Sequence, residues 1–433
     1  MPTELAKAGA VGIFRIRRPT SFRSSFPPAS LRHRHELASA PGGSKVGTPL
    51  HDDAPWPSSP AGPDPELQRL AAGLLRKAGI QINGQRPWDM QVLRPRVFER
   101  ALGQGSLGLG ESYMDGDWDA QHLDEFFHRL LRARLDREVQ PWRLLAHALR
   151  YRLLNLQNAR RAWQVGRRHY DLSNALYQAM LDPRMTYSCG YWETATTLEQ
   201  AQEAKLELIC RKLRLEPGMR LLDIGCGWGS LMAYAAQHHG VECVGVTVSQ
   251  EQANWASDRY RDLPVEFRLQ DYRTLTGKFD RIASVGMFEH VGHKNHRAFM
   301  QVAQRCLADD GLFLLHSIGK NERRARPDPW IDRYIFPNGD LPSIGQVGDA
   351  ADGLFVVEDL HNFGAYYDRT LMAWHANFEA AWPRFSALGE RFRRMWRYYL
   401  LSCAGAFRAR DIQLWQWVLS RRGVAGGYLR PQL

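Results

Sequence analysis

Three glycines at alternate positions, Gly225, Gly227 and Gly229, follow the acidic residue Asp223 and form the clearest chemical signal in the sequence. The apolar run before them predicts a strand over residues 220–224, and the residues after them predict a helix. Glycine accepts positive φ values and leaves room for a ligand beside the backbone. Open α/β sheets bind ligands at such strand-to-helix turns, outside the carboxyl ends of their strands. The stretch therefore predicts a small-molecule site.

The spacing of the glycines distinguishes between two classes of cofactor. A dinucleotide site has the pattern Gly-x-Gly-x-x-Gly, followed about 20 residues later by an acidic residue. Here the last glycine position of that pattern is Ser230, and the next predicted strand ends in Thr-Val-Ser at 247–249, without an acid. The order Asp-x-Gly-x-Gly-x-Gly instead resembles the first motif of class I methyltransferases. That resemblance implies S-adenosylmethionine as the cofactor, with its amino-acid half admitted by Gly225 and Gly227 beside Asp223.

Further polar and aromatic groups follow the later predicted strands, at residues 247–252, 270–272, 287–292 and 316–319. The carboxyl ends of parallel strands share one edge of a sheet, so these groups are predicted to face the same ligand. One of them contains Glu289, directly after an apolar strand. A carboxylate there is costly to bury unless hydrogen-bond donors or a charged ligand accompany it.

Five longer motifs make the resemblance more specific. They are HYDLSN at 169–174, YSCGYW at 187–192, GMFEHVG at 286–292, YIFPNG at 334–339 and AGAFRAR at 404–410. Taken together and in this order, they are similar to the cyclopropane-fatty-acyl-phospholipid synthases, from about Pro65 into the C-terminal region. The similarity implies an enzyme that transfers a methylene group from S-adenosylmethionine to the cis double bond of an unsaturated acyl chain in a membrane phospholipid, forming a cyclopropane ring.

The resemblance also implies a mechanism. The alkene attacks the cofactor methyl group, which gives a carbocation, and a base then removes a proton from the added methyl group as the ring closes. In the family this base is a bound bicarbonate, held by a cysteine, a glutamate, a histidine, an isoleucine backbone group and a tyrosine. By motif position these residues are Cys189, Glu289, His316, Ile318 and Tyr367.

The side chains in this set also have ordinary structural interpretations. Glu289 is compatible with a carboxylate at a helix N-terminus, and His316 with a core histidine whose hydrogen bonds are satisfied. Cys189, without the family pattern, is a small buried hydrophobe. On the functional side, His316 and Tyr367 are able to supply the donors that orient a bicarbonate. From the residue types alone both interpretations stay open.

The family pattern assigns further residues to the cofactor. It places Tyr170, Tyr187 and Ser188 near the methionine part, Thr247 and Gln252 near the ribose, and Asp271 or its neighbour Tyr272 at the adenine. Gln270 is also assigned to the cofactor. Thr247 departs from the acidic ribose ligand of most class I methyltransferases, but it is the form that this subfamily shows.

Strands and helices alternate from His169 onward. The predicted strands cover residues 220–224, 242–248, 265–269, 279–285, 311–317, 354–360 and 413–419. This alternation predicts an α/β fold with a doubly wound, seven-stranded, Rossmann-like sheet, and the catalytic domain is assigned to residues 169–433. The aromatic block at 320–343 interrupts the alternation and is predicted to cap the site.

Residues 64–140 predict a small, mixed but mainly helical lipid-binding domain. Its predicted elements are a helix from Pro65, a short strand at 80–82, and helices at 97–102 and 123–135. The glycine-rich run at 103–119 lacks the Gly-Lys-Ser/Thr of a phosphate loop. It is interpreted as a packing turn that presents Tyr113, Met114 and Trp118.

Two segments have unusual compositions. Residues 1–63 are rich in Pro, Ser, Gly and Arg, which predicts a disordered extension; a transit peptide is the alternative. The Arg-rich stretch at 129–168 contains no Lys and includes a predicted basic amphipathic linker helix at 141–168. Such a helix favours an anionic membrane surface, or else an interdomain helix whose apolar face is packed.

Composition limits the remaining possibilities. The net charge is +11 over 433 residues, and it is concentrated outside the catalytic domain. The Asn-Pro-Pro-Tyr motif of base-methylating enzymes is also missing, so both observations argue against a nucleic-acid substrate. Six scattered cysteines predict neither zinc site nor disulfides and favour a reducing compartment. No apolar run reaches the roughly 18 residues of a membrane span. We therefore expect a cytoplasmic protein, peripherally associated with the inner membrane face, and the family resemblance adds a homodimer.

Other functions share parts of these patterns. The same carbocation gives a methyl or methylene branch when it loses a different proton, so a C-methyltransferase that branches fatty acids without ring closure is an alternative. A small-molecule methyltransferase shares the glycine stretch, and a lipid-binding protein with an inactive cofactor site is the non-enzymatic alternative.

Overall fold

The structure of the protein, a computed structural model, describes residues 65–135, 174–323 and 327–433. Three predictions lie outside these residues: the disordered extension at 1–63, the basic helix at 141–168 and the cofactor contact of Tyr170. The described residues all belong to one compact unit that begins at Pro60.

In the part of the chain that the structure describes, the central sheet has seven strands in the order β5-β4-β3-β6-β7-β9-β8. They are β3 (Arg220–Ile224), β4 (Glu242–Thr247), β5 (Val265–Leu269), β6 (Phe279–Val285), β7 (Leu307–Lys320), β8 (Val356–Asn362) and β9 (Ile412–Ser420). The five from β3 to β7 are parallel, whereas β9 runs antiparallel to both β7 and β8. The seven predicted strands are confirmed, although β7 extends beyond its prediction at both ends.

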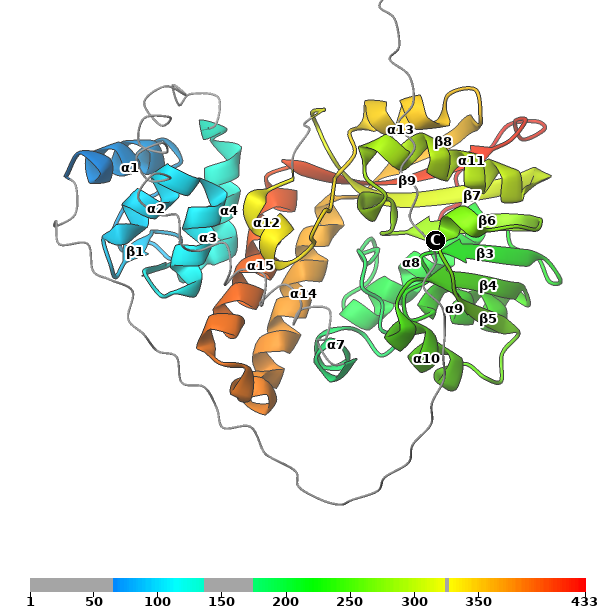
Figure 1. Ribbon diagram of the computed structural model, residues 1–433, viewed down its shortest axis with the longest axis horizontal. Coiled ribbons are helices and arrows are strands. Elements are labelled where there is room, and N and C mark those ends of the chain that lie inside the picture. The colour runs from blue at the N-terminus through cyan, green and yellow to red at the C-terminus, as the bar shows by residue number, and fades with distance from the viewer. Residues whose placement is uncertain (1–64, 136–173, 324–326) are drawn as a thin grey trace, which may run out of the picture. The chain divides into compact units, whose positions relative to one another are not determined.

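Helices cover both faces of this sheet (Figure 1). They include α8 (Leu198–Lys212), α9 (Ser230–His239), α10 (Gln250–Arg259), α11 (His296–Cys306) and α13 (Ile344–Ala351). Successive strand residues point to opposite faces. Accordingly, Leu314 lies in the core with α8 and α9, and its neighbour Leu315 lies in the core with α11 and α13. This arrangement confirms the doubly wound fold.

The strand order reverses beside β3. The chain proceeds outward from β3 to β4 and β5, and then returns to the other side of β3 through β6 and β7. The carboxyl ends of strands on the two sides of such a reversal border a crevice in which open α/β sheets bind ligands. The glycine turn follows β3, so it lies at this position.

Further helices pack beyond the sheet. They are α7 (Asn174–Met180), α12 (Pro329–Tyr334), α14 (Ala365–Ala381) and α15 (Glu390–Arg408). Helices α14 and α15 pack against each other and contact β9, and α14 also packs against α7. Their buried faces are rich in aromatic rings, among them Trp374, Trp396 and Tyr399. These helices therefore bring aromatic side chains to the carboxyl edge of the sheet.

The N-terminal part consists of short elements. They are α1 (Pro65–Lys77), β1 (Gln91–Val92), α2 (Arg96–Gln104), α3 (Ser106–Met114), β2 (Trp118–Asp119) and α4 (Leu123–Arg132). The predicted helices are confirmed, and α3 and α4 pack against α15. The strand predicted at 80–82 is wrong: among the described residues it is reduced to one bridge, between Ile82 and Met90.

The glycine-rich run was predicted as a turn, and this is wrong, because it contains the whole of helix α3. The two glycines within this helix are required by close packing. A Cβ atom at Gly108 would lie 1.9 Å from the carbonyl oxygen of Arg100, and one at Gly110 would lie 2.3 Å from the ring of Trp330. Tyr113, Met114 and Trp118, which the predicted turn was to present, are each at most 2% exposed.

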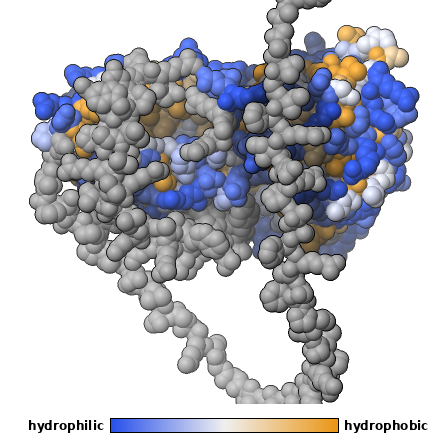
Figure 2. Space-filling view, turned by 45° about the horizontal axis from the view of Figure 1, so that its top comes forward, coloured by the Kyte–Doolittle hydropathy of each residue, from blue (hydrophilic) through white to orange (hydrophobic). Residues whose placement is uncertain are grey.

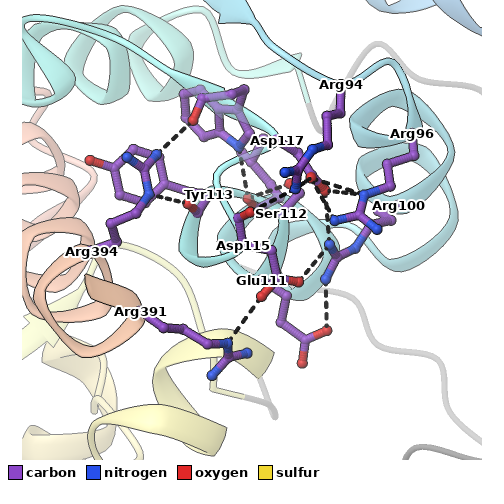
Figure 3. A network of polar contacts seen from close by, with 12 residues as sticks. Arg94, Arg96, Arg100, Glu111, Ser112, Tyr113, Asp115, Asp117, Arg391 and Arg394 are labelled. Carbon is purple, nitrogen blue, oxygen red and sulfur yellow. Dashed lines mark hydrogen bonds and ion pairs between the residues drawn. The ribbon is translucent and has the colours of Figure 1, made fainter. Parts of the chain in front are cut away.

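A network of ion pairs joins this part to α15 (Figure 3). The Asp117 side chain is fully buried and pairs with Arg96 at 2.8 Å and Arg100 at 3.0 Å. Asp115 pairs with Arg100 at 2.9 Å and with Arg391 of α15 at 3.0 Å. Because the Asp117 carboxylate is fully buried among arginine side chains, its loss leaves their partly buried charges uncompensated, which is strongly destabilising.

The aromatic block at 320–343 lies against two regions. Near its end, the backbone N–H of Asp340 donates to the carbonyl oxygen of Glu289 at 2.8 Å. In α12, the Tyr334 hydroxyl donates to Glu111 of α3 at 2.8 Å. The block therefore contacts both a predicted site residue and the N-terminal part.

The surface shows mixed hydropathy. On the face drawn in Figure 2, hydrophobic residues form separate groups among hydrophilic ones. Within residues 65–135, 174–323 and 327–433, no helix combines the length and the apolar character needed to cross a bilayer.

Candidate active site

The three glycines after β3 have different structural roles, although all have positive φ, at 88°, 55° and 81°. A Cβ atom at Gly225 would lie 2.6 Å from Met287, and one at Gly229 would lie 2.5 Å from the ring of Phe267. At Gly227, by contrast, no atom of the described residues other than its chain neighbours lies within 4 Å of the Cβ position. Gly227 therefore borders open space, as a cofactor-binding backbone does.

Asp223 lies at the end of β3 and is 2% exposed. Its Oδ1 atom has no hydrogen-bond partner among the residues described. Burial raises the pKa of this carboxyl to about 7, and the nearby charge of Lys205 acts in the opposite direction. A buried acceptor without a partner is costly, so the geometry fits a ligand that donates a hydrogen bond.

The residues predicted around the ribose meet at the end of β4. Thr247 donates through Oγ1 to Gln252 Oε1 at 3.0 Å, and the backbone N–H of Gln270 donates to the Thr247 carbonyl at 3.0 Å. Asp271 behaves differently: its carboxylate pairs with Arg273 at 2.6 Å, and this hydrogen bonding lowers its pKa to about 2.

Tyr272 begins the short 3-10 helix η2 (Tyr272–Thr274), and its ring lies 5.2 Å from that of Phe299 in α11. The structure therefore brings the predicted ribose residues Thr247 and Gln252 together. Asp271 and Tyr272 directly follow Gln270, whose backbone is bonded to Thr247. The Asp271 carboxylate, however, is already engaged by a neighbouring arginine.

The motif at 187–192 lies inside the fold. Tyr187 shares a hydrogen bond with Tyr399 of α15, with 2.8 Å between the hydroxyl oxygens. Ser188 Oγ accepts a hydrogen bond from Lys205 Nζ at 2.8 Å. Cys189 is fully buried, with its sulfur 3.9 Å from Thr370 Oγ1, and burial raises the pKa of its thiol well above the usual range.

Glu289 lies in η3 (Phe288–His290), directly after β6, and is 6% exposed. Its Oε1 atom accepts a hydrogen bond from the backbone N–H of Ile318 at 2.7 Å. Its Oε2 atom has no partner in the described parts of the protein. Burial raises the pKa of the carboxyl to about 7, against the opposing effect of the Ile318 hydrogen bond. Near neutral pH, the carboxyl is therefore able to donate as well as accept.

His316 lies near the end of β7 and is 1% exposed. The side-chain amide nitrogen of Gln416 on β9 lies 3.1 Å from its Nδ1 atom. The Nε2 atom has no partner within the residues that the structure describes. Burial lowers the pKa of His316 well below the usual value, and the charges of Lys205 and Lys212 act in the same direction. The ring is therefore neutral.

Tyr367 of α14 completes the predicted set. Its ring stacks on Phe407 with 4.5 Å between centroids. Burial raises the pKa of its phenol well above the usual value, and the charges of Cys189 and Glu289 act in the same direction. The Cys189 sulfur lies against Thr370, one turn further along α14, and Glu289 is bonded to the Ile318 N–H.

Aromatic rings line the same region. The ring of Tyr187 lies 5.1 Å from that of Trp374, and the ring of Tyr367 lies 6.0 Å from it. Aromatic faces attract cations, and the attraction is stronger where water is excluded. The arrangement is therefore able to stabilise a positively charged reacting centre.

The sequence reasoning missed two residues of this region. Lys205 is 1% exposed, and its pKa is lowered to about 8 by burial, although Asp182, Cys189 and Asp223 act in the opposite direction. Gln416 is fully buried against His316. The sequence carries no signal for Lys205, because Gln202, three residues earlier on the same helix face, is also polar and its burial is seen only in the structure.

Two features of the site fit bound ligands. The open space at Gly227 and the unpaired oxygen of Asp223 fit the amino-acid part of S-adenosylmethionine. The unpaired atoms Glu289 Oε2 and His316 Nε2 fit a small, buried polar ligand that forms hydrogen bonds with both of them.

Comparison with known proteins gives consistent matches. Residues 157–417 match the family described as mycolic acid cyclopropane synthetase. Over 367 residues the protein is 54% identical to the cyclopropane-fatty-acyl-phospholipid synthase of Escherichia coli K12, a match that covers 84% of this chain and 96% of that protein.

Two solved structures also match. The cyclopropane synthase MmaA2 from Mycobacterium tuberculosis has a TM-score of 0.55 at 33% identity and covers 60% of this chain and 97% of its own. The mycolic acid cyclopropane synthase CmaA1, complexed with SAH and CTAB, has a TM-score of 0.54 at 36% identity with the same coverage.

Proposed function

We propose that the protein forms cyclopropane rings on unsaturated acyl chains of membrane phospholipids. The proposal starts from its family: the chain belongs to the mycolic acid cyclopropane synthetases and is an S-adenosylmethionine-dependent methyltransferase. The substrate class follows the name of the E. coli relative, to which most of the chain is similar. The reaction adds one CH2 unit across a cis double bond and releases one proton.

The observation that carries the proposal is the pair of buried, unpaired polar atoms on Glu289 and His316. No group in residues 65–135, 174–323 or 327–433 satisfies Glu289 Oε2 or His316 Nε2. Glu289 and His316 are both buried, as are Cys189 and Tyr367. A site of this kind fits a small oxyanion that accepts hydrogen bonds from several neutral donors.

S-adenosylmethionine supplies the methyl group when bound, and bicarbonate supplies the base. The Asp223 carboxylate accepts from the ammonium of the cofactor, and the backbone at Gly227 lies against its amino-acid half. Thr247 and Gln252 face the ribose. Each contact uses a group that the structure brings to the carboxyl edge of β3 or β4.

In this proposal the protein's own residues hold the base in place. Glu289, in its protonated form, donates from Oε2, while Oε1 stays on the Ile318 N–H. The neutral imidazole of His316 donates from Nε2, and the phenol of Tyr367 donates from its hydroxyl. The rings of Tyr187, Trp374 and Tyr367 then stabilise the carbocation on the acyl chain until its proton is removed.

Membrane contact belongs to the same proposal. The relative's phospholipid substrate and the Arg-rich stretch at 129–168 support peripheral association with an anionic membrane surface, on the cytoplasmic side. Co-sedimentation with vesicles should then increase with the anionic lipid content and decrease with added salt. A homodimer is part of the proposal as well, and light scattering on the purified protein measures it.

The experiment is incubation with S-adenosylmethionine and vesicles of unsaturated phospholipid, followed by mass analysis and proton NMR of the fatty acids. We expect a gain of one CH2 per modified acyl group, ring protons at high field, and a rate that falls when bicarbonate and dissolved CO2 are removed. Vesicles of saturated phospholipid are the control.

Each other result points to a different function. Absence of the CH2 gain on every unsaturated lipid would refute the proposed activity, and retained cofactor binding in that case would favour a lipid-binding protein. Branched products without ring protons would identify a C-methyltransferase instead. A rate independent of bicarbonate would remove the proposed base while leaving the methyl transfer.

A further inference from the structure

We propose that Gln416 is a positioning residue that holds His316 in the tautomer with its proton on Nε2. The proposal rests on the bicarbonate site described under the proposed function. It starts from the register of the sheet, in which His316 of β7 lies directly opposite Gln416 of β9. Directly opposed residues of antiparallel strands point to the same face, so the two side chains meet.

Both side chains are enclosed. Gln416 is fully buried and His316 is 1% exposed, so water does not compete for their hydrogen bonds. The amide nitrogen of Gln416 lies 3.1 Å from Nδ1 of the imidazole. A side-chain NH2 group donates and does not accept. With the amide in this orientation, Nδ1 is the acceptor of this hydrogen bond.

The tautomer follows from the charge state of the ring. A neutral imidazole carries one proton, and when Nδ1 accepts, that proton is on Nε2. Burial keeps the His316 ring neutral by lowering its pKa, and the two lysines of α8 that influence it, Lys205 and Lys212, act in the same direction. Nε2, which is unpaired among the described residues, is then a donor.

This assignment decides whether His316 is able to hold an oxyanion. With the proton on Nε2, the ring donates to an oxygen of the base. With the proton on Nδ1, a nitrogen lone pair would face an oxygen lone pair, which is repulsive. Gln416 therefore acts on the base through His316, without touching the base itself.

Nitrogen-15 NMR of the histidine-labelled full-length protein tests the proposal directly. The two ring nitrogens of His316 are assigned by the signals that disappear in His316→Gln. In the wild type, we expect a protonated Nε2 and an unprotonated Nδ1. In Gln416→Glu, above the pH at which the new carboxyl ionises, the carboxylate accepts a hydrogen bond, so we expect a proton on Nδ1. A wild-type proton on Nδ1, or an unprotonated Nδ1 beside the ionised carboxylate of Gln416→Glu, would overturn the assignment.

Gln413 provides a matched control on the same strand. It is 6% exposed and donates to Asn321 Oδ1 at 3.1 Å and to the Arg410 carbonyl at 2.9 Å, away from His316. Gln413→Glu should therefore leave the His316 signals in their wild-type positions. Movement of these signals in the control as well would show that any change in β9 disturbs the ring, and would count against a specific role for Gln416.

A kinetic measurement separates positioning from a general structural role. Gln416→Met fills the space without a hydrogen-bond donor. We expect the half-saturating bicarbonate concentration to rise by about tenfold or more, as for a lost hydrogen bond to a charged group. The affinity for S-adenosylhomocysteine, measured by calorimetry, should stay unchanged. Loss of both affinities together would indicate a structural role and contradict the proposal.

The NMR result also distinguishes this proposal from the proposed function. If the wild-type rate does not depend on bicarbonate, the proposed base is wrong. The tautomer of His316 and its response to Gln416→Glu are still measured independently of turnover, and they support or refute the role of Gln416 by themselves.

Discussion

Replacing Glu289 with glutamine tests the site through the pH dependence of stability. The side chain is 6% exposed, its Oε1 accepts from the Ile318 N–H at 2.7 Å, and burial raises its pKa from 4.5 to about 7. Glutamine has the shape of the protonated carboxyl and keeps the acceptor for Ile318. Because glutamine does not ionise, the substitution removes the cost of a buried charge and little else.

The size of the effect follows from the pKa of Glu289. Its folded-state pKa lies above the unfolded value, so the folded protein binds the proton more tightly. The wild type therefore loses stability as the pH rises from about 4.5 to about 7. At 1.36 kcal/mol per pKa unit, the shift corresponds to about 3 kcal/mol. The free energy of unfolding of Glu289→Gln, relative to the wild type, should rise by this amount between about pH 4 and about pH 8.

Urea unfolding of the ligand-free protein at several pH values measures this difference. Glu242→Gln is the matched control, because Glu242 begins β4 as an exposed side chain that keeps its contact with water. Other titrating groups contribute equally to wild type and variant, so they cancel in the difference. A difference that stays constant with pH would show that the Glu289 carboxyl is not buried as described, and would refute the reasoning.

The same variant has an expected effect on turnover. Glutamine at this position still holds the Ile318 N–H, and the cofactor contacts lie on other residues, so affinity for S-adenosylhomocysteine should be unchanged. Turnover should fall by about a hundredfold, because an amide, unlike the Glu289 carboxyl with its pKa of about 7, cannot exchange a proton with the bound base. Unchanged turnover would remove Glu289 from the site.

Three further substitutions test other parts of the structure. Gly227→Ala should cost about 1 kcal/mol of stability because of its positive φ, and should weaken S-adenosylhomocysteine binding by at least about tenfold in calorimetry. Gly225→Ala should also lower the melting temperature clearly, because its Cβ atom would lie 2.6 Å from Met287. Lys205→Met should weaken the same binding about tenfold by removing a buried ammonium donor, and unchanged binding would contradict its place in the site. Asp117→Asn should lower the free energy of unfolding by about 3 kcal/mol, whereas Asp258→Asn, in an exposed pair, should change it by less than about 1 kcal/mol.

The catalytic fold was predictable because its signals are local. Each strand is a short apolar run followed by a turn, and the glycine spacing after β3 is specific to one class of cofactor. The limits of β7 were less predictable. The charged pair Asp309-Asp310 precedes its apolar part and argues against a strand from sequence alone, but pairing with β6 already begins before it, at Leu307. Tertiary pairing therefore extended the strand against its local composition.

The glycine-rich run at 103–119 shows the opposite case. Three glycines within six residues predict a turn, because glycine weakens a helix by about 1 kcal/mol relative to alanine. Two of them, Gly108 and Gly110, instead allow contacts with Arg100 and with Trp330, which is distant in the sequence. The contact with Trp330 cannot be read from the local sequence, so the helix was not predictable from it.

Lys205 and Gln416 were missed for a related reason. A lysine in a helix and a glutamine in a strand are ordinarily solvent-exposed. Only the register of β7 with β9 places Gln416 against His316, and only the packing of α8 on the sheet encloses Lys205. The motif residues were predictable because the family pattern identifies them, whereas the residues that orient them are identified by the fold.

The charge states of the site residues favour a bound anion. Burial moves Glu289, His316, Cys189 and Tyr367 towards their neutral forms, through raised pKa values for the acids and a lowered pKa for the histidine. If the carboxyl and the thiol were ionised they would repel an oxyanion, whereas in their neutral forms they donate to it. Lys205, with a pKa of about 8, still carries positive charge near neutral pH. Neutral donors beside a buried cation favour a bound anion, which is consistent with the base that we propose for ring closure.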